Sequence, residues 1–345
     1  MHTKDGILTE LQSSKKVASY NWGIIGPGKI AHDFTNDLKL VQPAQHVTAV
    51  LGKELEEATD LAKEFEASTP YTDLDAFIRH EGLHIAYIAT PHPQHYKEAL
   101  ACLQHKIPVL CEKPLTLNAA QANDLVQASK DNNCFLMEAM WIRFLPGIQK
   151  MMMLINEGTI GKVLSVKASM GFKAPKDGNS RYFNPAMGGG SLLDLGIYPL
   201  FLAHLLLGKP STIKAAGRLS DKGVDEAAAI LLDYNGKAQA LLDASLLSQS
   251  DRPAEIAGEK GIIRIQHPWF EKSTGIELEL YNGMKQVFPT SWDGHGLQFE
   301  IEEVVQCLDN KKIESILYPH AFTSEVSQAM DEIRNQIHVV YKDFE

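Results

Sequence analysis

Short apolar runs alternate with amphipathic stretches from Tyr20 to about Ala139, and this alternation constrains the fold more than any other feature of the chain. Repeated strand–helix–strand units of this length indicate parallel strands joined by crossover helices. The alternation therefore predicts a doubly wound α/β domain. The expected strands cover 22–25, 46–51, 85–89, 108–111 and 135–139, and the expected helices cover 30–40, 53–65, 94–104 and 119–131.

The rhythm changes after Trp141, where strands follow one another with few helices between them. Such a succession indicates a mainly antiparallel sheet. The turn sequence Tyr234-Asn235-Gly236-Lys237 predicts a hairpin. The expected strands cover 163–169, 213–217, 227–233, 239–246, 254–258, 262–266 and 276–281, and the expected helices lie near 190–207, 297–308 and 320–338.

The length of 345 residues suits about two domains. We divide the chain into an N-terminal extension (1–19), a first domain (20–139) and a second domain (140–345). The last predicted helix is free to pack against either domain. In the helix expected at 53–65, Leu55, Ala58 and Leu61 are predicted to share the buried face.

Charge and composition exclude several classes of protein. The 43 acidic and 33 basic side chains give a net charge of −10, which argues against nucleic-acid binding. We find no apolar run long enough to span a membrane and no secretory pattern in residues 1–20. Widely spaced cysteines without a CxxC pair are typical of reduced residues, so we expect a cytoplasmic protein. They are Cys102, Cys111, Cys134 and Cys307.

The first expected strand runs into Gly26-Pro27-Gly28-Lys29-Ile30-Ala31, a G-x-G-x-x-A pattern that opens a helix. The first glycine permits a tight turn, the second lets a pyrophosphate approach the backbone, and Ala31 lets the helix pack closely on the strand. The helix N-terminus supplies N–H donors to the phosphates. The context predicts a dinucleotide site in the first domain.

The end of the second strand indicates which dinucleotide binds. A carboxylate usually meets the NAD ribose there, whereas this chain has Leu51-Gly52-Lys53. A small residue followed by a cation suits a 2′-phosphate, so we expect NADP. Glu54 is the next residue and keeps NAD as the alternative.

Lys113 lies in Glu112-Lys113-Pro114, directly after the strand expected at 108–111. Ligands bind at the carboxyl ends of the strands in open α/β sheets, and Pro114 biases Lys113 toward an extended backbone. The position therefore predicts a functional lysine rather than a solvated surface group.

With these motifs the sequence resembles the Gfo/Idh/MocA oxidoreductases, and within them the dimeric dihydrodiol dehydrogenase branch. The resemblance extends from about Asn21 to the C-terminus. Five ordered motifs at family-like separations are more specific than any one of them. The motifs are 26–31, 89–92 with His95, 112–114, 138–146 and 188–198.

The resemblance implies a Rossmann dinucleotide-binding domain followed by an α/β domain with an open, mainly antiparallel sheet. The conserved lysine of the family falls on Lys113 and its acidic residue on Asp194, while Tyr198 stands where the sugar- and inositol-oxidising branches have a catalytic histidine. It also implies a homodimer joined through the second sheet. The cofactor-binding residues expected from motif and resemblance together are Gly26, Gly28, Lys29, Ile30, Lys53, Thr90, Pro91, His92, His95, Glu112 and Lys113.

Oxidation of a CH–OH group needs hydride departure to a nicotinamide and a base for the hydroxyl proton. Asp194 and Tyr198 are four residues apart and share one face of a helix. We expect Tyr198 to be the general acid/base, Lys113 to lower its pKa toward neutrality and anchor the substrate, and Asp194 to orient them. The alternative interpretation is a core tyrosine and a helix-capping aspartate.

Several other residues are candidates for the site. His92 and His95 form a weak metal pattern, so no metal is expected, and His95 is a candidate cap for the following helix. The remaining candidates could line a substrate cleft at the domain junction or form a loop that covers it. They are Trp141, Arg143, Phe144 and Arg181.

The sequence thus predicts an NADP-dependent oxidoreductase that acts on a cyclic polyol, a sugar or a trans-dihydrodiol. A non-enzymatic protein that senses a dinucleotide with the same fold is the alternative. The presence of Lys113, Asp194 and Tyr198 together favours the enzyme.

Overall fold

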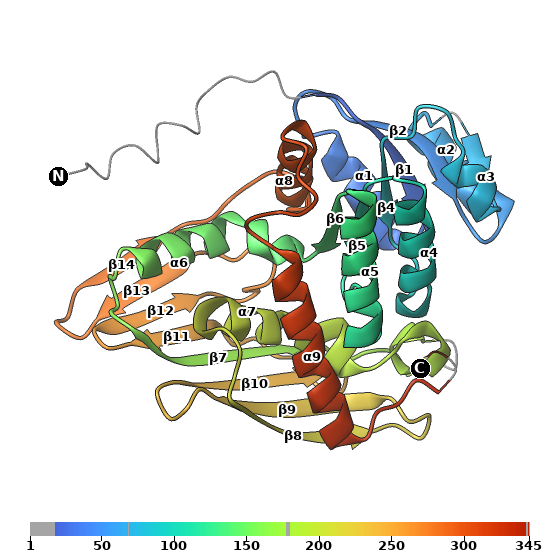
Figure 1. Cartoon of the computed structure of the whole chain (residues 1–345). Coiled ribbons are helices and arrows are strands. Elements are labelled where there is room, and N and C mark those ends of the chain that lie inside the picture. Colours follow the sequence, from blue (N-terminus) through green and yellow to red (C-terminus); the bar gives the residue numbers. More distant parts are fainter. Residues whose placement is uncertain (1–17, 68, 177–179, 343, 345) are drawn as a thin grey trace.

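The computed structural model describes residues 18–67, 69–176, 180–342 and 344, and it contains two β-sheets with helices packed on them (Figure 1). The extension predicted at 1–19 lies almost entirely outside the described residues. The first sheet has the strand order β3-β2-β1-β4-β5-β6 and is parallel throughout its described pairs. The order reverses beside β1, which creates a crevice at the carboxyl ends of β1 and β4.

Strands β4, β5 and β6 are buried along their whole length because helices cover both faces of this sheet. Its strands are β1 (Asn21–Ile25), β2 (His46–Leu51), β3 (Thr69–Tyr71), β4 (Ile85–Ile88), β5 (Val109–Glu112) and β6 (Leu136–Ala139). Its helices are α1 (Lys29–Leu38), α2 (Leu55–Glu64), α3 (Leu74–Ile78), α4 (His92–Gln104) and α5 (Ala119–Asn132).

The second sheet has eight strands in the order β14-β13-β12-β11-β7-β10-β9-β8, and of its described pairs only β7–β10 is parallel. Its strands are β7 (Val163–Gly171), β8 (Thr212–Leu219), β9 (Asp225–Asp233), β10 (Gln239–Ser245), β11 (Ala254–Gly258), β12 (Gly261–Ile265), β13 (Ile276–Leu280) and β14 (Lys285–Phe288). The predicted fold class, a parallel dinucleotide-type sheet followed by an open and mainly antiparallel one, is confirmed.

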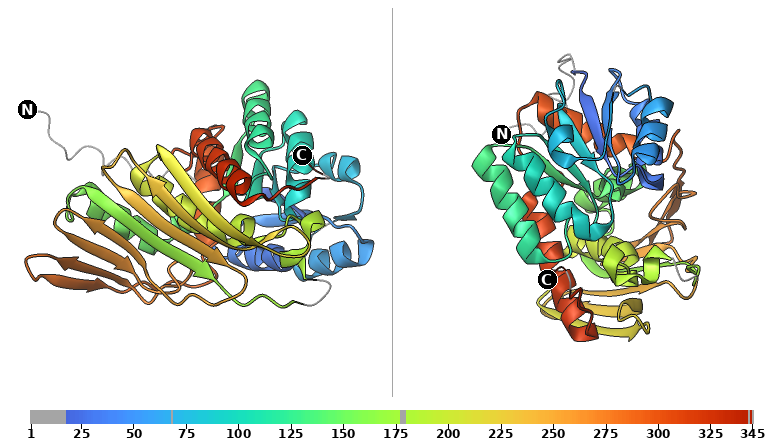
Figure 2. Two further views of the ribbon diagram at one scale, coloured as in Figure 1. Left: turned by 90° about the horizontal axis from the view of Figure 1, so that it is seen from below. Right: turned by 90° about the vertical axis from the view of Figure 1, so that its right-hand side faces the viewer.

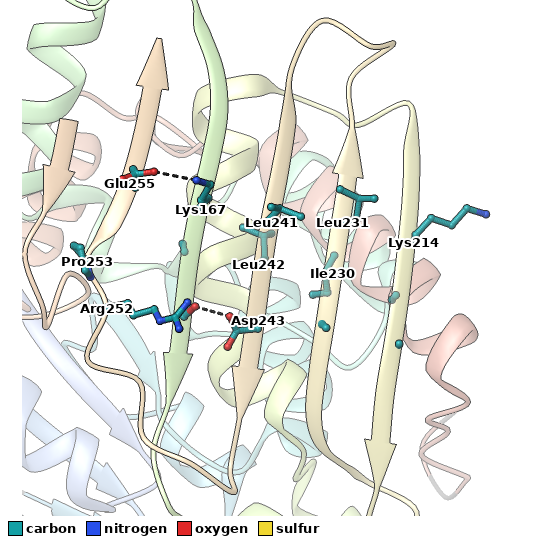
Figure 3. Close-up of a pocket in the computed structure, with 15 residues that line it drawn as sticks. Lys167, Lys214, Ile230, Leu231, Leu241, Leu242, Asp243, Arg252, Pro253 and Glu255 are labelled. Carbon is teal, nitrogen blue, oxygen red and sulfur yellow. Dashed lines mark hydrogen bonds and ion pairs between the residues drawn. The ribbon is translucent and has the colours of Figure 1, made fainter. Parts of the chain in front are cut away.

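Helices cover one face of the second sheet (Figure 1). They are α6 (Pro146–Asn156), α7 (Ile197–Leu207) and α9 (His320–Ile337), while α8 (Gln298–Asp309) packs beside α1. Viewed from below, the strands of the second sheet lie in front (Figure 2, left). The uncovered face carries Leu231 and Leu241, which are 39% and 45% exposed, beside Lys167 and Asp243 (Figure 3).

Each sheet and the helices packed on it form one layer. Helix α9 packs against α5 of the first layer and against β8 and α7 of the second, so it contacts both layers. The segment Pro185–Leu207, which contains α7, is apolar and long enough by composition to cross a membrane, although the sequence predicted no such segment. Most of it is buried inside the protein, as a core helix is. Its apolar character follows from this burial.

The hairpin expected at 234–237 joins β9 to β10, which pair antiparallel from Asp233 and Gln239. Asn235 and Gly236 both have positive φ, 57° and 67°. A two-residue turn with the right-handed twist of the flanking strands requires this, and asparagine and glycine adopt it at low cost.

The sequence analysis did not predict four of the elements in the described structure: β3, α3, α6 and β14. β3 has three residues and α3 has five, too few to show a periodicity. The predicted buried face of α2 was wrong at one position. Leu55, in the first turn, is 57% exposed, whereas Ala58 and Leu61 are buried as predicted.

Asp37, near the end of α1, ties the first layer to the segment that precedes α8. The Asp37 carboxylate is buried and accepts N–H hydrogen bonds from the backbone of His295, Gly296 and Leu297, at 2.8–2.9 Å for the shortest of each. The His295 ring adds a contact through Nδ1 at 3.0 Å. One carboxylate therefore satisfies three consecutive backbone N–H groups in the segment that leads into α8.

We predict that Asp37→Ala lowers the free energy of unfolding by about 3 kcal/mol, since it leaves several buried N–H groups without an acceptor. Urea unfolding followed by tryptophan fluorescence measures this loss. Asp60→Ala, an exposed aspartate on α2, is the matched control and should change stability by less than about 0.5 kcal/mol. Equal stability of the two variants would contradict the importance of this link.

Candidate active site

A cavity of about 500 Å³ lies where the crevice of the first sheet meets the start of α7. It brings together the glycine loop after β1, the loop after β4, the end of β5 and the segment that leads into α7. The lining residues include the following predicted ones: Gly28, Lys29, Ile30, Thr90, Pro91, His92, Glu112, Lys113, Trp141, Arg181, Asp194 and Tyr198. The sequence therefore located most of this cavity.

The glycine loop is shaped to receive a ligand at the N-terminus of α1. Gly26 has φ +88°, and a Cβ there would meet the Thr90 backbone nitrogen at 2.8 Å. Above Gly28, by contrast, no described atom lies within 4 Å of where a Cβ would stand, so a ligand can reach the backbone. Ala31 is fully buried, as close helix–strand packing requires. Open space, backbone N–H groups and the helix dipole together fit a pyrophosphate.

The loop after β4 is fixed by two buried histidines. The sequence suggested that His95 caps α4, but the residue lies inside this helix. Its ring stands between the carbonyl oxygens of Pro114 (2.9 Å) and Thr90 (2.8 Å). Burial lowers the pKa of His95, and a neutral ring donates to one of these oxygens at a time. His95 thus connects the two loops that border the cavity.

His92 joins the first layer to the segment before α7, because its Nδ1 donates to the Gly188 carbonyl at 2.9 Å. Burial, together with the neighbouring His95 and Lys113, lowers the pKa of His92 to about 3, so the ring is neutral. Within the part of the chain that the structure describes, no group of three His, Cys, Asp or Glu side chains is placed to hold a metal ion.

Lys113 follows β5 and is 11% exposed. Its Nζ donates to the Asp194 backbone carbonyl at 2.9 Å, lies 3.5 Å from the Asp194 carboxylate and stands 4.9 Å from the centroid of the Tyr198 ring. Burial acts to lower the pKa of Lys113, but Tyr198, Asp194 and Glu112 outweigh it and raise the pKa overall. Lys113 is therefore a cation in the cavity.

Asp194 lies in a π-helical turn, Leu192–Gly196, immediately before α7. Burial acts to raise the pKa of Asp194, but Lys113 and Arg181 outweigh it and hold the pKa below its usual value. Arg181 Nη2 lies 3.2 Å from the carboxylate. The sequence predicted a regular helix here, and local π turns of this kind are frequent at functional sites.

The Tyr198 hydroxyl accepts a hydrogen bond from Trp141 Nε1 at 3.1 Å. Burial raises the pKa of Tyr198, and the opposing effect of Lys113 is smaller. The expectation that Lys113 brings this phenol toward neutrality is therefore wrong for the structure described. Lys113 acts in the predicted direction, but the desolvation of the phenolate outweighs it.

A run of glycines, Gly188 to Gly190, sets the start of this helix. Gly188 has φ +66°, and a Cβ there would meet His92 Cβ at 2.8 Å. Gly190 has φ +127° and leads into Ser191, whose hydroxyl and the following N–H both donate to the buried Asp225. Larger residues could not bring the segment this close to α4.

Three predicted residues lie elsewhere. Arg143 Nε donates to the Leu317 carbonyl at 3.0 Å, and Phe144 is buried in the core, so neither belongs to the described residues that line the cavity. Both side chains pack the junction instead of lining the cavity. Lys53 is exposed just beyond β2, outside this lining, and remains a prediction for the nucleotide ribose.

The sequence interpretation missed Asp33 and Met187 among the lining residues. Asp33 could have been predicted from the sequence, since it lies one helical turn after Lys29 on the same face of α1 and pairs with it. Met187 reaches the cavity from a short 3-10 turn that has no sequence periodicity.

The parallel sheet, its glycine turn and the charged cavity beside it define a nucleotide-dependent oxidoreductase. Residues 20–140 match the oxidoreductase family with an NAD-binding Rossmann fold, and residues 148–264 match the GFO/IDH/MocA C-terminal domain. The chain belongs to the Gfo/Idh/MocA oxidoreductase family, and it is an NAD(P)-dependent enzyme of the dehydrogenase class.

Curated relatives are trans-1,2-dihydrobenzene-1,2-diol dehydrogenases. The mouse (Mus musculus) enzyme is 33% identical, with 93% of this chain and 97% of that protein covered, and the zebrafish (Danio rerio) enzyme is 34% identical with the same coverage. Two solved structures share the fold. A 3-ketoreductase from Actinomadura kijaniata with NADP and TDP-benzene has a TM-score of 0.81 at 22% identity, covering 93% of this chain and 98% of that one. A levoglucosan dehydrogenase with NADH and levoglucosan has 0.82 at 20%, with the same coverage.

We predict that the neutral state of His92 makes the protein less stable in mild acid. Its pKa is about 3 when folded and near 6.5 when unfolded, so the unfolded chain binds the additional proton below pH 6.5. The contribution of the neutral ring to stability is complete above pH 6.5 and falls as the pH drops toward 3. Between pH 7.5 and pH 5 the loss is about 2 kcal/mol.

His92→Gln keeps a donor for Gly188 without a titrating ring. The free-energy difference between wild type and His92→Gln should therefore shrink by about 2 kcal/mol from pH 7.5 to pH 5 in urea unfolding. His46→Gln, an exposed position on β2, is the control. If His92→Gln and the wild type lose stability in parallel, His92 is not the titrating group.

Proposed function

We propose that this protein transfers a hydride between NADP and a CH–OH or carbonyl carbon of a sugar, a cyclic polyol or a trans-dihydrodiol. The observation that carries the proposal is the meeting of Lys113, Asp194 and Tyr198 in the same cavity as the N-terminus of α1. The curated relatives are dihydrodiol dehydrogenases, and the similar solved structures include sugar-acting enzymes. These relatives support the substrate class.

The residues divide the work of proton transfer in the reduction direction. A bound nicotinamide supplies the hydride that reaches the carbonyl carbon. Tyr198, whose raised pKa keeps its proton, donates that proton to the oxygen as negative charge develops there. Lys113 Nζ and the Trp141 Nε1–H then stabilise the phenolate that remains.

In the oxidation direction the same groups act in reverse, since Tyr198 must lose its proton before it can accept one from the substrate hydroxyl. The cation Lys113 favours that ionisation, and Asp194 holds Lys113 in place. The oxygen of the substrate would lie between Tyr198 and Lys113, where both can reach it. The hydrogen of the C–H bond leaves with its electron pair as a hydride that oxidised NADP would accept, and the proton that Tyr198 loses beforehand goes to solvent.

The cofactor assignment to NADP rests on Lys53. The residue is exposed just beyond the end of β2, where the adenosine ribose lies in sheets of this type. A lysine there attracts a 2′-phosphate, while Glu54 beside it would instead suit a free ribose. The residues that would hold the rest of the nucleotide are those at Gly26–Ile30 and Thr90–His92.

A cofactor-reduction screen tests the proposed function. Wild-type protein is assayed with NADP and with NAD against xylose, glucose, inositol and trans-dihydrodiols. Turnover with NADP in at least one substrate class supports the proposal, whereas faster turnover with NAD would contradict the assignment based on Lys53. Nucleotide binding without any turnover would favour the alternative of a dinucleotide sensor.

Replacement of Tyr198 isolates the proton-transfer step. We predict that Tyr198→Phe lowers kcat by about 10²–10⁴-fold while the Kd for NADPH changes less than about twofold. Stopped-flow turnover and NADPH fluorescence titration provide the two readings. Tyr281→Phe, which removes an exposed hydroxyl after β13, is the control. Unchanged turnover in Tyr198→Phe would transfer the acid role to another group, first of all Lys113.

We also propose a cytoplasmic homodimer that forms through the second sheet. The uncovered face presents Leu231 and Leu241, which are 39% and 45% exposed, beside the ion pair of Lys167 with Glu255 (Figure 3). Apolar side chains on an uncovered sheet face are typical of an interface. All four cysteines are free and buried, as suits a reducing compartment.

For the homodimer, we predict that Leu241→Glu shifts the protein from dimer to monomer, because it places a charge in the apolar centre of the proposed interface. Light scattering coupled to size exclusion gives the mass directly. Leu55→Glu on α2, another exposed leucine, should leave the mass unchanged. A wild-type monomer at all concentrations would contradict the interface.

A further inference from the structure

A second cavity of about 570 Å³ adjoins the catalytic one. The two share Tyr198 and Trp141, together with the first turns of α1. From there the second cavity extends between α1 and the loops at 271–272 and 294–297. A molecule that reacts at Tyr198 can therefore continue into this space.

The inner wall of the second cavity is held in place by a buried carboxylate. Asp37 fixes the backbone of residues 295–297 and the His295 ring through Nδ1. The other ring nitrogen of His295, Nε2, lies 3.5 Å from Asp33 Oδ1, and Asp33 also pairs with Lys29. The Nδ1–H of His295 is directed at Asp37, so the neutral ring presents Nε2 as an acceptor beside the Asp33 carboxylate, and the fold positions both acceptors in advance.

The opposite wall comes from the loop between β12 and β13. Glu271 and Lys272 line the cavity from this loop, which is anchored by the buried Trp269, whose Nε1 donates to the Ser169 carbonyl at 2.9 Å. Trp141 supplies an aromatic surface at the junction of the two cavities. The lining therefore offers acids and bases on both sides and an aromatic surface between them.

We propose that this second cavity binds a further hydroxylated ring of the substrate, so that the enzyme acts on a glycoside or disaccharide and not only on a single ring. The proposal rests on the proposed function of the first cavity. Carboxylates and the His295 Nε2 accept hydrogen bonds from hydroxyl groups, and the ammonium group of Lys272 donates to hydroxyl oxygens. An anion fits this wall less well, because Asp33 and Glu271 would repel it.

His295 and Lys272 are the positions for a test, because they line the second cavity and are not among the described residues that line the first. We compare the wild type with the double variant His295→Ala/Lys272→Ala. The substrates are two matched pairs, glucose with cellobiose and xylose with xylobiose. Lys237→Ala, in the exposed turn between β9 and β10, is the control variant.

We expect the double variant to raise the KM for the disaccharide by about tenfold or more, as the loss of one or two hydrogen bonds to charged groups implies. The kcat and KM for the single sugar, and the Kd for NADPH, should change less than about twofold. A rise in KM that is equal for both members of a pair would overturn the proposal. So would a wild type that prefers single sugars.

A wild type that turns over none of the sugars, cyclic polyols and trans-dihydrodiols would refute the proposed function instead. In that case calorimetric titration of cellobiose and of glucose into the NADP-saturated protein examines the cavity without turnover. Tighter binding of cellobiose that the double variant loses would support the second cavity on its own. Absence of any preference for cellobiose would overturn it.

Discussion

A single ammonium group holds the reaction centre together. Lys113 is delivered by β5 of the first sheet, and its Nζ donates to the backbone carbonyl of Asp194, on the π turn that precedes α7. The two halves of the site, one from each part of the chain, are thereby joined at 2.9 Å. Together with the hydrogen bond from His92 to Gly188, this contact fixes the glycine loop relative to Tyr198.

Burial of so many ionisable groups is tolerable because their charges match. Lys113 lies between an anionic Asp194 and a neutral Tyr198, and Arg181 compensates the same carboxylate from the solvent side. Unpaired charges at this depth would cost several kcal/mol each. The rings of His92 and His95 are neutral, so they link loops without adding a buried charge.

The sequence predicted the architecture because strand periodicity and glycine motifs are local signals. The second strand, 46–51, was placed to the residue, and the helix at 320–337 was predicted within one residue. What it could not predict depends on three-dimensional burial. Arg143 looks like a substrate contact from its motif, yet it points at the Leu317 carbonyl, 174 residues away. The pKa of Tyr198 likewise depends on how deeply α7 is buried, which no spacing reveals.

Helix α1 connects two ligand-facing regions. Its N-terminus lies at the glycine loop, and near its other end Asp37 grips residues 295–297. A helix transmits small axial shifts with little loss, because its backbone hydrogen bonds make it stiff along its length. The glycine loop and the wall that carries His295 are thus attached to the two ends of one helix.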